Sequence, residues 1–338
     1  MSGEEFNGLV RSRLCELLNI DVPIVLAPFG PWDQVDLAAE VCEAGGLGSV
    51  GTAVRSVPEL QAQWQRLRQR TARPFAINHT RRPFNQAAFD ATLEFAPAAI
   101  SFHMGLPVDL IAAAHERGVV WLQTVGDVDG AIAAIEAGAD VLVAQGTEAG
   151  GNGGWVATMV LVPAVVDVAG DVPVVAAGGI ADGRGVAAAL ALGAQGVSLG
   201  TRFLATPEMG IDQAWKERIV AASALEAVKV PHAERVMPPF TLPQAAGVPF
   251  APRALRTELI DRLESDPASV DPAELGPQLL AAVRQGGGHD LLPFAGQSAQ
   301  LIHDVAPAAE LVARLIHGAA DALRRASEIT SNLSPRRG

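Results

Sequence analysis

The 338-residue chain has only two cysteines, Cys15 and Cys42, which is too few for a disulfide framework and lacks the spacing of a zinc site. Both lie in apolar stretches, so we expect them to pack as small hydrophobic side chains. Basic residues are also scarce. The chain has 25 lysines and arginines and 37 aspartates and glutamates, which gives a net charge of −12. This balance argues against binding to a nucleic-acid backbone, which requires a basic face.

Long apolar runs are missing as well. No stretch of about 18 apolar residues is free of charge, glycine and turn signals, which predicts that the chain has no transmembrane helix. The opening residues, MSGEEFNGLV, contain neither the basic nor the apolar segment of a secretory signal peptide. We therefore expect a cytoplasmic protein that binds neither membrane nor nucleic acid.

Short β-type runs are abundant, and each is followed by a stretch of helical periodicity. The runs are apolar throughout, as in a parallel sheet that helices cover. Eight such units in unbroken succession predict an α/β fold of the TIM (β/α)8 barrel type. An open doubly wound sheet is the competitor, but the first glycine-rich strand end lacks GxGxxG. The runs are residues 23–28, 46–52, 75–79, 99–105, 119–125, 141–146, 172–179 and 196–201.

The pattern changes after the eighth run. A proline-rich stretch, MPPFTLPQAAGVPFAPRALR, is followed by segments with helical spacing and then by the polar end TSNLSPRRG. We predict a barrel over residues 1–215, a smaller, mostly helical appendage over 216–330 that covers the barrel mouth, and a frayed tail over 331–338.

The active site of such a barrel lies at the carboxyl ends of its strands. Glycines, amides and two histidines gather there, without a three-ligand metal set. Gly178 and Gly179 end the seventh run, and Gly200 and Thr201 end the eighth. Barrels often bind phosphate at these two loops, and backbone N–H groups suit a dianion. The alternative is that these glycines only close tight turns.

Amide side chains end the third and fifth runs. Asn78 and Gln123 can hydrogen-bond a flat heteroaromatic ring, and Pro28 and Phe29 can pack against it. Together with a phosphate site, this predicts FMN as the cofactor. The alternative is that both amides bond only to the protein backbone.

Seven segments resemble the nitronate monooxygenase family, also called 2-nitropropane dioxygenase. They are PIVLAPF, AEVCEAGGLGSVGT, RPFAIN, ISFHMGLP, VLVAQGTEAGG, PVVAAGGIADGRGVAAALALGAQGVSLGTRFL and PFAGQSAQLIHDV. The resemblance implies an FMN-dependent barrel enzyme that oxidises alkyl nitronates with O2 by electron transfer to flavin. The FMN contacts that it implies are Pro28, Phe29, Asn78, Gln123, Gly150, Gly151, Gly178, Gly179, Gly200 and Thr201.

The sequence departs from the family at three of its site positions. The family commonly has methionine at Phe29 and often lysine at Gln123. Its pattern E-A-G-G-H-x-G carries a histidine, assigned as catalytic base or substrate-binding group, where this chain has Asn152 in GTEAGGNGG. An amide cannot accept a proton at any usable pH, whereas an alkyl nitronate has already lost its α-proton. We therefore expect nitronates to be oxidised and neutral nitroalkanes to be poor substrates.

His103 is the second catalytic candidate, because SFHMG recurs in the family with this histidine. His79 and Glu148 are weaker candidates for a base. Two other functions stay open on the same barrel: an NAD(P)H-dependent flavin reductase of the enoyl-thioester or quinone reductase type, and a non-catalytic flavin-binding protein. The expected partners are a small-molecule substrate and O2, and exposed faces of the Ala-rich helices allow a homodimer.

Overall fold

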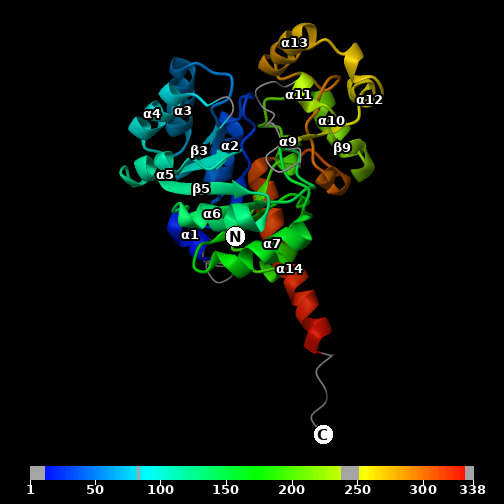
Figure 1. Cartoon of the computed structure of the whole chain (residues 1–338). Coiled ribbons are helices and arrows are strands. Elements are labelled where there is room, and N and C mark those ends of the chain that lie inside the picture. The colour runs from blue at the N-terminus through cyan, green and yellow to red at the C-terminus, as the bar shows by residue number, and fades with distance from the viewer. Residues whose placement is uncertain (1–11, 82–83, 237–250, 332–338) are drawn as a thin grey trace.

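The computed structural model describes residues 12–81, 84–236 and 251–331. Within them, eight parallel strands form one sheet in the order β1-β8-β7-β6-β5-β4-β3-β2 (Figure 1). Each strand falls within or beside one of the predicted apolar runs. The strands are β1 (Ile24–Leu26), β2 (Gly48–Gly51), β3 (Phe75–Thr80), β4 (Ala99–His103), β5 (Val120–Val125), β6 (Val141–Gln145), β7 (Val174–Ala177) and β8 (Gly196–Leu199).

The sheet closes on itself between β1 and β2. On one side β1 pairs with β8, with Val25 opposite Ser198. On the other side Val25 bridges to Leu47, directly ahead of β2. The Leu47 N–H donates to the Ile24 carbonyl at 2.9 Å, and the Leu26 N–H donates to the Leu47 carbonyl at 2.9 Å. The predicted TIM barrel is confirmed.

Helices follow the strands and form the outer shell of the barrel. Asp127 caps α6 by accepting from the Gly130 N–H at 2.7 Å, and Asp182 caps α8 by accepting from the Arg184 N–H at 2.9 Å. Such caps satisfy N–H groups that the first helical turn leaves without partners. The helices of this part are α2 (Val35–Glu43), α3 (Val57–Arg70), α4 (Gln86–Phe95), α5 (Val108–His115), α6 (Val128–Glu136), α7 (Thr158–Ala169) and α8 (Gly183–Ala191).

Helix α1 (Arg13–Leu18) closes the end of the barrel that lies opposite the carboxyl ends of the strands. Leu14, Cys15 and Leu18 of this helix belong to the hydrophobic cluster that includes Leu122 and Val141 from the strands. Cys42 lies in the second cluster, between strands and helices. Both cysteines are buried and free, as expected.

The chain beyond β8 is mostly helical, with one short antiparallel pair. Its last helix, α14, packs on α8 and α2 of the barrel shell and extends below the rest of the molecule (Figure 1). Gly183 and Gly318 bring the backbones of α8 and α14 into direct contact. The elements are α9 (Thr201–Leu204), α10 (Gln213–Ala221), η1 (Ala224–Glu226), β9 (Ala227–Lys229), α11 (Ala233–Val236), β10 (Arg253–Leu255), α12 (Glu258–Ser265), η2 (Pro267–Ser269), α13 (Pro272–Arg284), η3 (Gln297–Leu301) and α14 (Ala308–Ser331).

Most of the proline-rich stretch (residues 237–250) and most of the predicted tail (332–338) lie outside the described residues. The division of the chain at residue 215 stays a prediction. In the described ranges, no helix is both long enough and apolar enough to span a membrane.

Candidate active site

A cavity of about 570 Å³ lies at the carboxyl ends of the strands, a size typical of small-molecule sites. Strand residues such as Asn78 and Thr124 line its inner part, and residues of α13 line its outer part. Among the described residues, no aspartate, glutamate, lysine or arginine contributes to the lining. The cavity is therefore uncharged at neutral pH unless a histidine is protonated.

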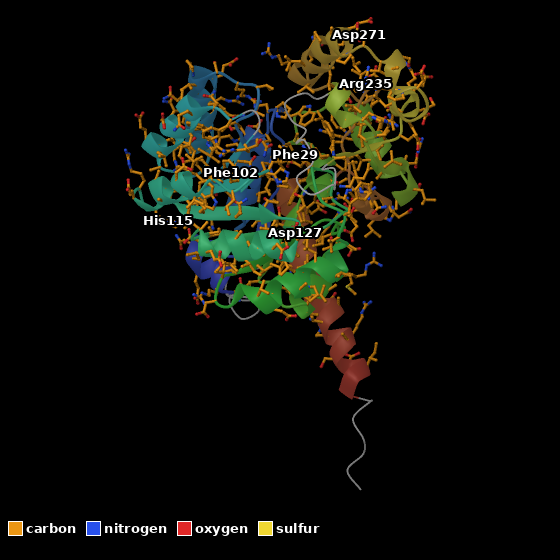
Figure 2. The ribbon with its side chains drawn as sticks, viewed as in Figure 1. Phe29, Phe102, His115, Asp127, Arg235 and Asp271 are labelled. Atoms are coloured by element: carbon orange, nitrogen blue, oxygen red, sulfur yellow. The ribbon has the colours of Figure 1, made fainter. Side chains whose placement is uncertain are left out.

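The structure brings all but one of the implied FMN contacts to this cavity, together with the two main catalytic candidates. Phe29 lies at the edge of the barrel that faces the helical segment carrying Arg235 and Asp271 (Figure 2). The predicted residues that line the cavity are Pro28, Phe29, Asn78, His103, Gly150, Gly151, Asn152, Gly178, Gly179, Gly200 and Thr201.

Gln123 is the exception. Its side chain is buried and bonds within the protein: Trp121 Nε1 donates to its Oε1 at 3.1 Å, and its Nε2 donates to the Gly105 carbonyl at 2.9 Å. Leu122 and Thr124 line the cavity instead, because successive side chains of a strand point to opposite faces. The structure therefore contradicts the predicted contact between Gln123 and the cofactor.

His79 also lies away from the cavity. Its Nε2 is 2.9 Å from Thr92 Oγ1 of α4, and its ring packs edge-on against Phe89. Burial lowers the pKa of His79 to about 3. His79 is thus a neutral residue between β3 and α4, and its candidacy as a catalytic base is wrong.

His103 and Asn152 each bring an unpaired polar atom to the cavity wall. His103 Nε2 and Asn152 Oδ1 are buried, and neither has a hydrogen-bond partner within the described part of the chain. Burial lowers the pKa of His103 to about 4, and a backbone hydrogen bond with Asn152 opposes this shift in part. An unpaired buried polar atom costs about 1–3 kcal/mol, so both atoms destabilise the fold.

The glycine loops after β7 and β8 form a cradle with exposed backbone. Gly178 and Gly179 have φ of +100° and +74°, and a Cβ on Gly178 would meet Thr158 Oγ1 at 3.0 Å. Thr201 begins α9, and its Oγ1 accepts from the Gly296 N–H at 2.8 Å. Exposed backbone N–H groups of this kind fit an anionic phosphate group.

The stretch GTEAGGNGG, residues 146–154, forms the loop after β6 and is held from both sides. Within the barrel, Glu148 Oε2 accepts from Thr158 Oγ1 at 2.8 Å. Beyond the barrel, a Cβ on Gly150 would meet the Gly296 nitrogen at 2.9 Å, and the Gln297 N–H donates to the Glu148 carbonyl at 2.9 Å. Glu148 thus supports the loop and is not among the residues that line the cavity.

Two basic residues from the short β9–β10 pair also hold this loop. Arg253 donates through Nε to the Thr147 carbonyl at 2.6 Å, and its backbone N–H donates to the Gly150 carbonyl at 2.9 Å. Lys229 Nζ donates to the Gly153 carbonyl at 3.0 Å, and burial lowers its pKa to about 8. These contacts span 76 or more residues of sequence, so no local pattern indicates them.

The sequence predicts that the appendage covers the barrel mouth, but not which of its residues line the outer part of the cavity. We call this part the outer chamber. Residues 276, 279, 280 and 283 of α13 face this chamber. They have the i, i+3, i+4, i+7 spacing of one helical face, and this spacing is the sequence pattern that indicates them. The outer chamber is lined by Trp32, Trp215, Val236, Gly276, Leu279, Leu280, Val283 and Phe294.

Comparison with known proteins decides the family. The profile described as nitronate monooxygenase matches residues 11–88 and 79–318. The chain belongs to the nitronate monooxygenase family. It is a flavin-dependent oxidoreductase of the nitronate monooxygenase type, as the resemblance of its motifs implied.

Named relatives of this nitronate monooxygenase family member differ in activity. The chain is 36% identical over 264 residues to the (3aS,4S,5R,7aS)-5-hydroxy-7a-methyl-1-oxo-octahydro-1H-indene-4-carboxyl-CoA dehydrogenase of Mycobacterium tuberculosis, covering 76% of this chain and 69% of that protein. It is 34% identical over 265 residues to a probable nitronate monooxygenase of Staphylococcus saprophyticus, covering 64% and 74%. The solved structure of FabK from Thermotoga maritima is similar with a TM-score of 0.84 and 32% identity, covering 95% and 99%.

Proposed function

We propose that the protein oxidises alkyl nitronates with O2 and that its flavin is FMN. The observation that carries the proposal is the uncharged cavity, in which neither of the catalytic candidates, His103 and Asn152, can serve as an effective base. Asn152 carries an amide, and His103 with a pKa of about 4 is a weak proton acceptor. A nitronate needs no such base, because its α-proton is already gone.

The residues at the cavity fit FMN in two groups. The cradle of Gly178, Gly179, Gly200 and Thr201 would hold the phosphate through N–H groups and one hydroxyl. The flavin ring would lie against a second group, formed by Pro28, Phe29, Asn78, Gly150 and Gly151. When bound, FMN supplies an electron acceptor that returns its electrons to O2.

His103 and Asn152 would position the substrate. With no cation in the described lining, hydrogen-bond donors would hold the nitronate oxygens, and Nδ2 of Asn152, unlike its Oδ1, is such a donor. Neutral His103 avoids a proton source that would convert the nitronate back to the neutral nitroalkane. The apolar face of α13 shields the site from water, which strengthens these hydrogen bonds.

Anaerobic half-reactions test the proposal. Denaturation of the purified protein should release FMN rather than FAD, as chromatography and mass spectrometry will show. Mixing with ethyl nitronate under nitrogen should bleach the flavin, whereas NADH, NADPH and neutral nitroethane should bleach it slowly. Rapid bleaching by NADH or NADPH together with none by the nitronate would establish a reductase instead.

A further inference from the structure

The chain has only two lysines, Lys216 and Lys229, and the second holds the loop that carries Asn152. Lys229 lies on β9, and its Nζ donates to the carbonyls of Gly153 and Ala251, each at 3.0 Å. Gly153 and Ala251 also form an isolated antiparallel bridge. One ammonium group therefore joins the loop after β6 to the β9–β10 pair through the residue next to Asn152.

The Asn152 peptide is held from the other side by residues of the barrel. Gln145 Nε2 at the end of β6 donates to the Asn152 carbonyl at 2.8 Å. His103 at the end of β4 also forms a hydrogen bond with the Asn152 backbone. The carbonyls of two consecutive residues are thus bound by different parts of the fold, Asn152 by the barrel and Gly153 by Lys229. The direction of the Asn152 side chain depends on both contacts, because it is set by the main chain between them.

Two positive charges lie directly across the β9–β10 pair and bind the same loop. Arg253 is opposite Lys229 in the register, and like charges directly opposite one another destabilise a strand pair. Arg253 Nε donates to the Thr147 carbonyl near the start of the loop at 2.6 Å, whereas Lys229 binds the Gly153 carbonyl near its end. The Glu148 carboxylate in the same loop raises the pKa of both cations against the effect of burial. The loop therefore compensates the repulsion between the two cations.

We propose that Lys229 is a positioning residue, which fixes the direction of the Asn152 side chain by binding the Gly153 carbonyl. The inference rests on the proposed function, in which the Asn152 amide donates to the nitronate. Lys229 is not among the residues that line the cavity, so it acts only through the loop. Arg253 independently holds the Gly150 carbonyl, so loss of Lys229 should weaken substrate binding and leave the flavin bound.

A double-mutant cycle with Asn152→Ala tests this role. Lys229→Met keeps an unbranched apolar stem but removes both hydrogen bonds. In the parent protein it should raise the KM for ethyl nitronate roughly three- to tenfold with little change in kcat. In the Asn152→Ala protein it should raise the KM less than about twofold, because no amide is left to position. Equal increases in both proteins would overturn the positioning role.

Lys216→Met is the matched control. Lys216 is buried on α10, its Nζ donates to the Pro207 carbonyl at 3.4 Å, and burial lowers its pKa as well. It is not among the residues that line the cavity. This variant should keep the KM of the parent protein. A KM raised as much as in Lys229→Met would show that loss of any buried lysine is sufficient, and would overturn the specific role of Lys229.

The charge of Lys229 provides a second readout. Burial and Arg253 lower its pKa to about 8, and Glu148 opposes this shift. The uncharged Trp155 ring lies 5.6 Å from Nζ. A charged donor binds a carbonyl more strongly than a neutral one, so kcat/KM of the parent should fall as the pH rises through about 8. Lys229→Arg stays charged and should not show this decline, and an identical decline in that variant would contradict the dependence on this charge.

Hydrogen exchange separates this inference from the proposed function. Deuterium uptake by residues 146–154, measured by mass spectrometry, should be faster in Lys229→Met than in the parent and in Lys216→Met. If ethyl nitronate does not react but this difference is found, the proposed function fails and the hold of Lys229 on the loop stands. If ethyl nitronate is oxidised but the difference is absent, the positioning role is refuted.

Discussion

Gly150 and Gly296, which are 146 residues apart, meet backbone to backbone across the mouth of the barrel. A Cβ on Gly150 would lie 2.9 Å from the Gly296 nitrogen and 3.0 Å from the Ala295 carbonyl carbon. The same Gly296 N–H donates to Thr201 Oγ1. One contact thus joins the loop after β6, the start of α9 and the segment ahead of η3, all of which line the cavity.

Replacing Gly150 tests this junction. Gly150→Ala should lower the melting temperature and the flavin content of the purified protein, because backbone atoms cannot move aside as a flexible side chain does. Gly154→Ala in the same loop is the control, since its Cβ would meet the Gly126 carbonyl oxygen at 3.5 Å and the Gly126 Cα at 3.9 Å, which are ordinary contacts. Equal flavin content and melting temperature in the two variants would contradict a role of close backbone packing.

A substitution of Thr201 tests the proposed phosphate cradle. Thr201→Val keeps the shape but removes the hydroxyl that accepts from Gly296 and would contact the phosphate. We expect FMN to dissociate about tenfold more readily, as for the loss of one hydrogen bond to a charged group, measured by fluorescence titration of the stripped protein. Thr206→Val serves for comparison, because Thr206 is fully buried and bonds to the Phe203 carbonyl outside the cavity. Unchanged FMN affinity in Thr201→Val would remove this residue from the site.

The third prediction concerns Asn152 and the form of the substrate that the protein uses. Asn152→His introduces a titratable base at the cavity wall, and general base catalysis typically contributes about 10²–10⁴-fold. Oxygen uptake with neutral nitroethane should rise markedly relative to uptake with ethyl nitronate. Asn152→Gln, which keeps an amide, should leave that ratio low. A parent protein that already uses both forms with equal efficiency would refute the argument from the missing base.

His79 gives the protein a pH-dependent stability. Its pKa is about 3 when folded and about 6.5 when unfolded. As the pH falls from 6.5, the unfolded chain binds a proton that the folded protein does not, so the free energy of unfolding falls by up to about 1.4 kcal/mol per pH unit. His79→Gln removes this contribution, and urea unfolding between pH 6.5 and 4 should show a shallower slope. His103 acts in the same direction and remains in both proteins, so the slope should become shallower without vanishing.

The barrel was predictable because its strands are buried on both faces. Runs such as PIVLAP and VLVAQG are apolar without alternation, which distinguishes them from surface strands and leaves few other folds. The glycine loops after β7 and β8 were also predictable. Glycines at a strand end expose the backbone, and the carboxyl ends of the strands are where a barrel of this type has its active site.

Gln123 shows where that reasoning fails. A residue at the end of a strand faces the cavity only if its side chain points inward, and the register that decides this depends on strand pairing. Phe102 pairs with Gln123 in the barrel, and both point toward the helices. Trp32 and Trp215 were beyond prediction for another reason: 183 residues separate two rings that meet only when the appended helices fold over the barrel.

The contact between Gly183 and Gly318 has a consequence for biosynthesis. Gly183 is the first residue of α8, directly after the proposed phosphate cradle, and its backbone rests on the last helix of the chain. A nascent chain that has emerged only through β8 contains every strand of the barrel but leaves this helix start uncovered. The start of α8 therefore reaches its final packing only after α14 has been synthesised.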